Sequence, residues 1–234
     1  MTHMRERASR RRALRAAFPA TLPVMAGFLC LGLAYGVLMA SKGYGPLWST
    51  LMSMIAFGGS MQFVAITLLT TAFDPLQAFL LSVMVNARHL FYGLALLERY
   101  KGLGRVRAIL IYTLCDETFS LVSSLETPEG VDRRDYYLCI SLLNYVYWVA
   151  GTAAGGLLGG LITFNTRGMD FALTALFVVL FLEQWKKREN RPAGIIGMAC
   201  AAVSLAVFGP ENLVIPAMVL VLAALLAGRR RLCT

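Results

Sequence analysis

Apolar runs of about 20 residues follow one another along most of the chain, and short polar or charged connections separate them. A helix of roughly 20 residues, rising about 1.5 Å per residue, crosses the hydrocarbon core of a bilayer. The apolar residues are continuous rather than alternating with polar ones, which favours helices over membrane strands. The pattern therefore predicts an all-α, polytopic membrane helix bundle of about eight spans. The predicted spans are 17–40, 47–72, 76–97, 106–125, 137–162, 169–185, 193–208 and 213–228.

The third span carries polar side chains at its centre. Such side chains persist in hydrocarbon where they face a bundle interior, a water-filled cavity or a partner charge. At about 100° per residue they share one face of the helix, whereas Leu90, Phe91 and Leu94 occupy the other. We therefore expect this span to handle something polar inside the membrane. The residues of the polar face are Asn86, Arg88, His89, Tyr92 and Gly93.

The fourth span holds two adjacent carboxylates, Asp116 and Glu117, near its middle. The helical period places them in one polar stripe with Thr113, Ser120 and Ser124. This helix therefore has a polar face of its own, and we expect it to meet the polar face of the third span.

Arg88 and these carboxylates allow two interpretations. A salt bridge from Arg88 to Asp116 or Glu117 would simply hold two helices together. One arginine cannot neutralise two carboxylates, however, so the surplus charge calls for a proton or a cation. With His89 as a proton relay, the residues favour a solute or proton pathway.

The second span contains two glycines and a serine, Gly58, Gly59 and Ser60, followed by the buried amide of Gln62. This composition favours local unwinding and predicts a broken helix, whose freed backbone amides could bind a carboxylate. The alternative is a kink at which another helix packs closely.

Three further expectations concern the second half of the chain. Asn144 should form an interhelical hydrogen bond, and Tyr145 and Trp148 should lie at the membrane interface. Asp170 should cap the sixth span. The segment 209–212 should form a tight turn, with a second re-entrant site as the alternative.

Composition and charge agree with a membrane protein. Hydrophobic residues make up 58% of the 234 residues, and the mean hydropathy is +0.65. The net charge of +9 would suggest nucleic acid in a soluble protein. Here the basic residues lie at span ends, so they indicate orientation instead, and we expect no nucleic-acid partner.

The basic residues predict cytoplasmic termini. Eight spans with the N-terminus inside place 15 Lys and Arg inside and 6 outside. If 47–72 re-enters without crossing, the split becomes 11 against 10, which keeps a seven-crossing arrangement open. In the eight-span arrangement, the basic segment 99–107 lies outside and is the one exception to the rule that basic segments lie inside. We expect basic tails at 1–16 and 229–234 and a single transmembrane domain over 17–228.

The five cysteines, Cys30, Cys115, Cys139, Cys200 and Cys233, are scattered, with no C-x-x-C pair. They favour packing roles over a disulfide framework or a metal site. The sequence also contains no H-E-x-x-H motif, which argues against a zinc-dependent membrane protease. We expect no metal and no cofactor.

Taken together, the motifs resemble the AzlC family, the large subunit of bacterial branched-chain amino acid exporters. The similarity extends over about 18–228. One departure is Met61, which stands where the family has a smaller alanine. The matching stretches, in the family's order, are 57–63 (FGGSMQF), 85–94 (VNARHLFYGL), 116–119 (DETF) and 169–177 (MDFALTALF).

The resemblance implies a secondary transporter subunit of the bacterial inner membrane that exports valine, leucine, isoleucine or similar apolar amino acids and is driven by the proton gradient. It also implies a hetero-oligomer with a small AzlD-like membrane subunit of about four spans. In this interpretation Arg88 binds substrate and pairs with Asp116. The expected substrate-binding residues are Gly58, Gly59, Ser60, Gln62, Asn86, Arg88 and Tyr92, and the expected proton-coupling residues are His89, Asp116 and Glu117.

Two other function classes stay open. A structural or sensory membrane subunit would use the same charges only to bind its partner. A membrane-embedded hydrolase would use Asp116, Glu117 and His89 as acid–base groups, but the sequence offers it no nucleophile or metal set.

Overall fold

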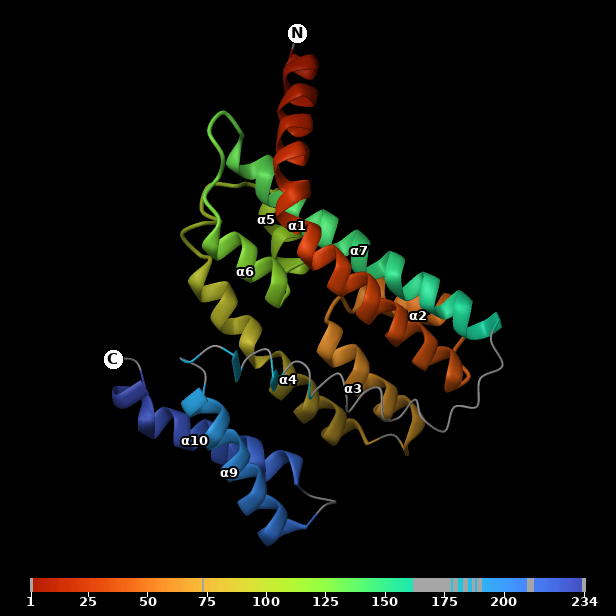
Figure 1. The fold of residues 1–234 in the computed structure, drawn as a ribbon, viewed down its shortest axis with the longest axis vertical. Coiled ribbons are helices and arrows are strands. Elements are labelled where there is room, and N and C mark those ends of the chain that lie inside the picture. The colour runs from red at the N-terminus through yellow and green to blue at the C-terminus, as the bar shows by residue number, and fades with distance from the viewer. Residues whose placement is uncertain are drawn as a thin grey trace. The chain divides into compact units, whose positions relative to one another are not determined.

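The computed structural model describes residues 2–72, 74–161, 178, 181–182, 185–186, 188, 191–209 and 213–232. Every regular element among them is a helix, which confirms the predicted all-α class (Figure 1). The chain forms two compact units, Met1–Thr166 and Arg167–Thr234, and each is described by itself. A single domain over 17–228 stays a prediction. Among the described residues, four helices are long and apolar enough to cross a membrane: Ser9–Ser41, Pro75–Ala95, Arg133–Leu161 and Arg191–Phe208.

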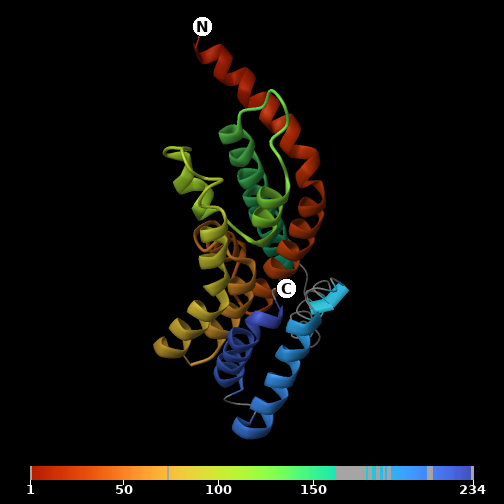
Figure 2. The same cartoon turned by 90° about the vertical axis from the view of Figure 1, so that its left-hand side faces the viewer.

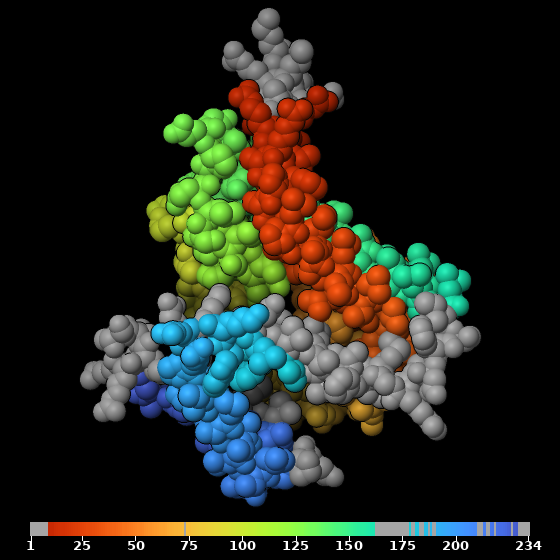
Figure 3. All heavy atoms as spheres, viewed as in Figure 1, coloured from red at the N-terminus to blue at the C-terminus, as the bar shows by residue number. Residues whose placement is uncertain are grey.

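Two long helices, α1 (Thr2–Ser41) and α7 (Arg133–Leu161), run parallel and side by side through the first unit (Figures 1 and 2). Ser9 Oγ donates to Asp135 Oδ2 at 2.8 Å near their beginnings. Near their ends, a Cβ added to Gly159 would lie 2.7 Å from the Ala40 Cβ. The contact therefore extends along most of both helices. Figure 3 shows the outward side of α1, which carries exposed apolar residues.

Glycines allow this close approach. A Cβ added to Gly36 would overlap the backbone at Thr152, and one added to Gly155 would overlap the backbone of Leu33. Backbone atoms cannot rotate away as a flexible side chain can, so these positions admit only glycine without a shift of one helix. Close contacts between small residues are the main source of helix association in lipid, where the hydrophobic effect between helices is absent.

The predicted second span is two helices, α2 (Pro46–Ile55) and α3 (Gly59–Thr70). The Tyr44 hydroxyl, just before α2, donates to the Leu69 carbonyl at the end of α3 at 3.1 Å. The segment therefore begins and ends at the same place and folds back at Ala56–Gly58, its tip. Its arms are about 15 and 18 Å long, roughly half a bilayer each. The predicted broken helix is confirmed, in the re-entrant form. We call this segment, 46–70, the first hairpin.

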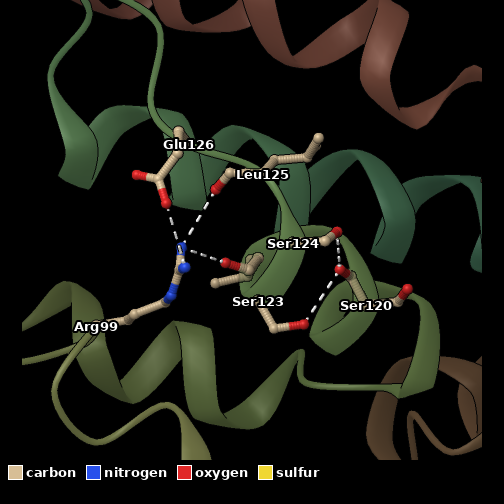
Figure 4. A network of polar contacts seen from close by, with 7 residues as sticks. Arg99, Ser120, Ser123, Ser124, Leu125 and Glu126 are labelled. Atoms are coloured by element: carbon tan, nitrogen blue, oxygen red, sulfur yellow. Dashed lines mark hydrogen bonds and ion pairs between the residues drawn. The ribbon is translucent and has the colours of Figure 1, made fainter.

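The predicted fourth span is also two helices, α5 (Val106–Tyr112) and α6 (Asp116–Ser124). Arg99, before α5, donates from Nη1 to the carbonyls of Val122 at 2.9 Å and Leu125 at 3.2 Å, at the end of α6 (Figure 4). This segment, 106–124, is the second hairpin, and Thr113–Cys115 is its tip. The prediction of one helix with a single polar stripe is therefore wrong.

Helix α4 (Pro75–Ala95) connects the two hairpins. It starts at Asp74, whose Oδ1 accepts from the amides of Leu76 and Gln77 at 2.9 and 3.2 Å, a typical N-cap. Leu90 is 73% exposed, and Phe91 and Leu94 are similarly exposed. The predicted apolar face of this helix is thus turned away from the rest of the first unit.

The second unit contains α9 (Arg191–Phe208) and α10 (Val214–Leu232), which pack against each other. Arg191 Nε donates to the Trp185 carbonyl at 3.2 Å, at the start of α9. Most of the predicted sixth span, with Asp170 and the 169–177 motif, lies outside the described residues. The same holds for most of the predicted 209–212 turn.

We expect Gly155→Ala to lower the free energy of unfolding by about 1–3 kcal/mol, because the new Cβ has only the Leu33 backbone to displace. Gly160→Ala, on the same helix with no atom within 4 Å, is the matched control and should leave stability unchanged. Thermal unfolding of the purified protein in detergent measures both. Equal melting temperatures for the two variants would contradict the packing described here.

Candidate functional site

Arg88 lies at the centre of α4 and connects the two hairpins. Its Nη1 pairs with Asp116 Oδ2 at 2.5 Å, and its Nη2 donates to Ser60 Oγ at 2.7 Å. Ser60 lies in the first turn of α3, and Asp116 is the first residue of α6. One guanidinium therefore joins the starts of the two returning arms. The expected pairing of Arg88 with Asp116 is confirmed.

The site has one arginine and two carboxylates. Arg88 forms its ion pair with Asp116, while Glu117 lies within electrostatic range of both. The Glu117 carboxyl also interacts with its own backbone amide and with the Cys115 thiol. With both carboxylates ionised, the cluster would carry one net negative charge, so it can accept a proton or a cationic group.

Several buried polar atoms of the cluster have no hydrogen-bond partner among the described residues: Arg88 Nε, Asp116 Oδ1 and His89 Nδ1. The Arg88 and Asp116 side chains as wholes are 38% exposed, so this ion pair borders open space. A buried polar atom without a partner is unfavourable and calls for a ligand or a water molecule. An unused donor and an unused acceptor therefore lie in one cluster.

The two helix starts at Arg88 differ in charge. Neither α3 nor α6 has a side-chain cap, so their first backbone amides lack an intrahelical partner. The start of α6 carries Asp116 and Glu117, which offset the positive end of its dipole. The start of α3, at Gly58–Ser60, carries no acidic residue. The site thus has a positive half on the first hairpin and a negative half on the second.

The other polar residues of α4 lie around this cluster. Asn86 Nδ2 donates to the Ser82 carbonyl at 2.9 Å, and a Cβ added to Gly58 would lie 4.0 Å from Asn86 Oδ1. The Tyr92 ring stacks on Phe119, with centroids 4.4 Å apart, and the His89 ring lies 5.6 Å from that of Tyr92. The polar face of α4 therefore reaches both hairpins.

Gln62 lies elsewhere, in the packed interior. It is 1% exposed, its Nε2 donates to Ser53 Oγ at 2.9 Å, and its Oε1 accepts from Trp148 Nε1 at 2.7 Å. Both ends of the amide are thus occupied by protein, so the geometry favours a structural role over the expected substrate contact. Trp148 is 3% exposed and packs against Gly59, so its predicted position at the membrane interface is wrong.

Asn144 forms the interhelical hydrogen bond that its position predicted. Its Nδ2, on α7, donates to Thr118 Oγ1 on α6 at 3.0 Å. Both side chains are fully buried. The contact fixes the returning arm of the second hairpin to α7.

Sequence reasoning missed the tyrosines at the hairpin tips. The Tyr112 hydroxyl donates to the carbonyls of Met54 and Ile55, the latter at 3.0 Å, and the Tyr145 hydroxyl donates to Met54 at 2.9 Å. The end of α2 leaves these carbonyls without intrahelical partners. Tyr112 belongs to the second hairpin, so the two tips touch. A tyrosine in the middle of an apolar run was the available signal.

Comparison with known proteins places this arrangement in a family. The model of the AzlC protein family matches residues 23–162, which contain both hairpins, α4 and every residue of the candidate site. The chain belongs to the AzlC family. This confirms the resemblance drawn from the motifs and indicates a membrane transport protein, not an enzyme.

Several known proteins are similar to this chain over most of its length. A branched-chain amino acid transport protein, AzlC, of Bacillus subtilis is 45% identical over 99% of this chain and 91% of its own length. An uncharacterized membrane protein of Haemophilus influenzae is 40% identical over 88% of this chain and 85% of its own. The inner membrane protein YgaZ of Escherichia coli is 29% identical over 79% of each chain. No solved structure matches this chain.

We expect Gln62→Leu to lower the melting temperature, because it leaves Trp148 Nε1 and Ser53 Oγ buried without partners, at about 1–3 kcal/mol for each unpaired group. Gln77→Leu makes the same chemical change at an exposed position of α4 and should have little effect. Thermal unfolding in detergent compares the two. A Gln62→Leu protein of normal stability that no longer binds substrate would restore the expected substrate contact.

Proposed function

We propose that this chain is a subunit of a secondary transporter in the bacterial cytoplasmic (inner) membrane, with both termini in the cytoplasm. It exports branched-chain or similar apolar amino acids in exchange for protons, together with a small AzlD-like membrane subunit. The proposal rests on Arg88, which lies between two uncapped helix starts and pairs with Asp116 at one and Ser60 at the other. Arg88 Nε and Asp116 Oδ1 have no hydrogen-bond partner among the described residues, so both are available to a ligand. The names of the Bacillus subtilis and Escherichia coli relatives support the substrate class and the membrane.

The charges of the site suit the two ends of a free amino acid. Its carboxylate would bind Arg88 Nε and the free amides at the start of α3, where a helix dipole favours an anion. Its ammonium group would bind Asp116 Oδ1 and Glu117. Since the two halves lie on different hairpins, a bound amino acid would bridge them.

Aromatic side chains border the same region and suit an apolar substrate side chain. Phe57 packs on Tyr145, with centroids 5.1 Å apart, at the first tip, and Tyr92 stacks on Phe119 at the second hairpin. Met61 lies close by, since a Cβ added to Gly58 would be 3.9 Å from its Cβ. A methionine at this position would narrow the substrate pocket relative to an alanine.

The surplus carboxylate supports proton coupling. Glu117 has no ion pair of its own among the described residues, because Arg88 is committed to Asp116. The neighbouring His89 has a buried Nδ1 without a partner. A proton on Glu117 would neutralise the cluster when the substrate's ammonium group leaves, and His89 would deliver or remove it.

Arg88→Ala should abolish efflux of labelled valine from vesicles that contain this chain and its small partner, under an imposed pH gradient. Arg88→Lys should lower the efflux rate at least tenfold, because one ammonium group cannot reproduce the planar contact with Ser60 and Asp116. Arg107→Ala, an exposed arginine outside the site, is the control and should transport normally. Efflux that survives Arg88→Ala at equal protein levels would leave Arg88 a structural bridge. No efflux of any apolar amino acid by the unaltered protein would reject the substrate class.

Glu117→Gln should separate transport from its energy source. We expect valine exchange across the vesicle membrane to persist, because the amide keeps the shape of the site, while pH-driven accumulation is lost. Glu126→Gln, at an exposed position next to Arg99, is the control and should retain both activities. If Glu117→Gln still accumulates valine against a gradient, the proton is carried elsewhere.

A further inference from the structure

Two segments of the chain have the same order of elements, although the lengths of corresponding elements differ. Helices α2, α3 and α4 form a hairpin and a long helix, and so do α5, α6 and α7. Helix α4 begins at Pro75 and α7 at Arg133, 58 residues later. Adding 58 also carries Gly58, the last residue of the first tip, onto Asp116, the residue that follows the second tip.

This register pairs residues that make equivalent contacts. Asp74 corresponds to Asp132, and each caps its long helix: Asp132 Oδ1 accepts from the Asp135 amide at 3.1 Å, as Asp74 accepts from α4. Ser60 corresponds to Thr118, and each hydroxyl accepts from the long helix that follows it, from Arg88 and Asn144 respectively.

Identical residues occur in the long helices at the same spacing. The matching pairs are Leu80 and Leu138, Asn86 and Asn144, Gly93 and Gly151, and Ala95 and Ala153. Individual matches of this kind are weak, but here they share one register with both caps and with both accepting hydroxyls, Ser60 and Thr118, whose donors Arg88 and Asn144 lie two positions apart in that register. A common plan of helix starts, breaks and contacts is the signature of an internal structural repeat.

The two copies are inverted. The base of the first hairpin, closed by Tyr44 and Leu69, lies at the end of α1, and α4 starts there. The base of the second hairpin lies at the beginning of α1 and α7, where Arg133 Nη2 donates to the Lys101 carbonyl at 3.1 Å and Ser9 binds Asp135. The hairpins therefore enter from opposite faces, and their tips touch through Tyr112.

Charge supports this arrangement. Residues 1–161 contain 14 Lys and Arg. Twelve lie on the face that holds the N-terminus and the base of the second hairpin, one (Lys42) lies on the opposite face, and Arg88 lies between. This is the asymmetry that orients membrane proteins. The basic segment 99–107, the exception in an eight-span arrangement, now lies on the basic face.

We propose that α2–α4 and α5–α7 are inverted copies of one unit, and that each hairpin is the gate of one membrane face. Arg88 and Tyr112 hold both gates closed over the site, and each gate opens in turn by releasing its tip. The inverted arrangement stands on the contacts alone, whereas the gating step rests on the proposed transport function. Inverted units with a site at their junction are a common basis for alternating access.

Cysteine labelling tests the arrangement. In a chain that retains only the buried Cys115, Arg11→Cys marks the N-terminal face, and Ala72→Cys, Glu98→Cys and Glu129→Cys are the reporters. A membrane-impermeant maleimide is applied separately to right-side-out and to inside-out vesicles. The labelled cysteines are then identified from the masses of their peptides. Inverted hairpins put Glu98 and Glu129 on the same face as Arg11, and Ala72 on the opposite face.

Other labelling patterns would overturn the inverted repeat. An eight-crossing chain would have Ala72 and Glu129 on the same face as Arg11, and Glu98 on the opposite face. Seven crossings place Glu98 with Arg11, and Ala72 and Glu129 opposite. Neither pattern bears on whether the chain transports valine, which the efflux measurement decides separately.

Native Cys115, buried at the second tip, reports the gate. Tyr112→Phe removes the hydroxyl that ties the tips, so we expect a permeant maleimide to label Cys115 about fivefold faster, the factor for one hydrogen bond of about 1 kcal/mol. Tyr44→Phe removes one tyrosine hydrogen bond at the base of the first hairpin and should leave the rate unchanged. Equal labelling rates in the two variants would overturn the gating role of Tyr112.

Discussion

The guanidinium of Arg88 is the constraint on which the centre of the protein depends. A charged arginine at mid-membrane is stable only with nearby partners, and an unbroken helix has no free polar backbone to offer. Its two side-chain partners, Ser60 and Asp116, lie in the first turns of α3 and α6. Both first turns exist at this depth because the chain breaks and folds back on each side. The broken helices and the half-buried arginine therefore stabilise each other.

Close packing between α1 and α7 forms the support for both hairpins. Because glycines bring these backbones together, the parallel pair forms a compact wall, and α7 contacts both hairpins from one side of it. Trp148 binds Gln62 of the first hairpin, and Asn144 binds Thr118 of the second. The buried amides thus fix the returning arms to a rigid helix.

The sequence predicted one helix break and not the other for a physical reason. Gly58 and Gly59 mark the first break, because glycine destabilises a helix interior. The second break, at Thr113–Cys115, contains neither glycine nor proline, and only tertiary partners such as Arg88 and Asn144 stabilise it. The polar cluster was predictable because charge in hydrocarbon is conspicuous. The hydrogen-bond partners of Gln62 and Trp148 could not be predicted from the sequence, because they depend on which helices the fold brings together.

In the proposed inverted repeat, the two copies differ at the helix starts beside Arg88, where a zwitterionic substrate would bind. In the common register Gly58 and Gly59 correspond to Asp116 and Glu117, so one helix start keeps its positive end free and the other carries two carboxylates. Two identical positive helix starts would both attract the carboxylate and both repel the ammonium group. In the proposed function, the difference would orient an amino acid, with its carboxylate toward the first hairpin and its ammonium group toward the second. A substrate bound in this way would contact both gates at once, and its binding and release would bias which gate opens.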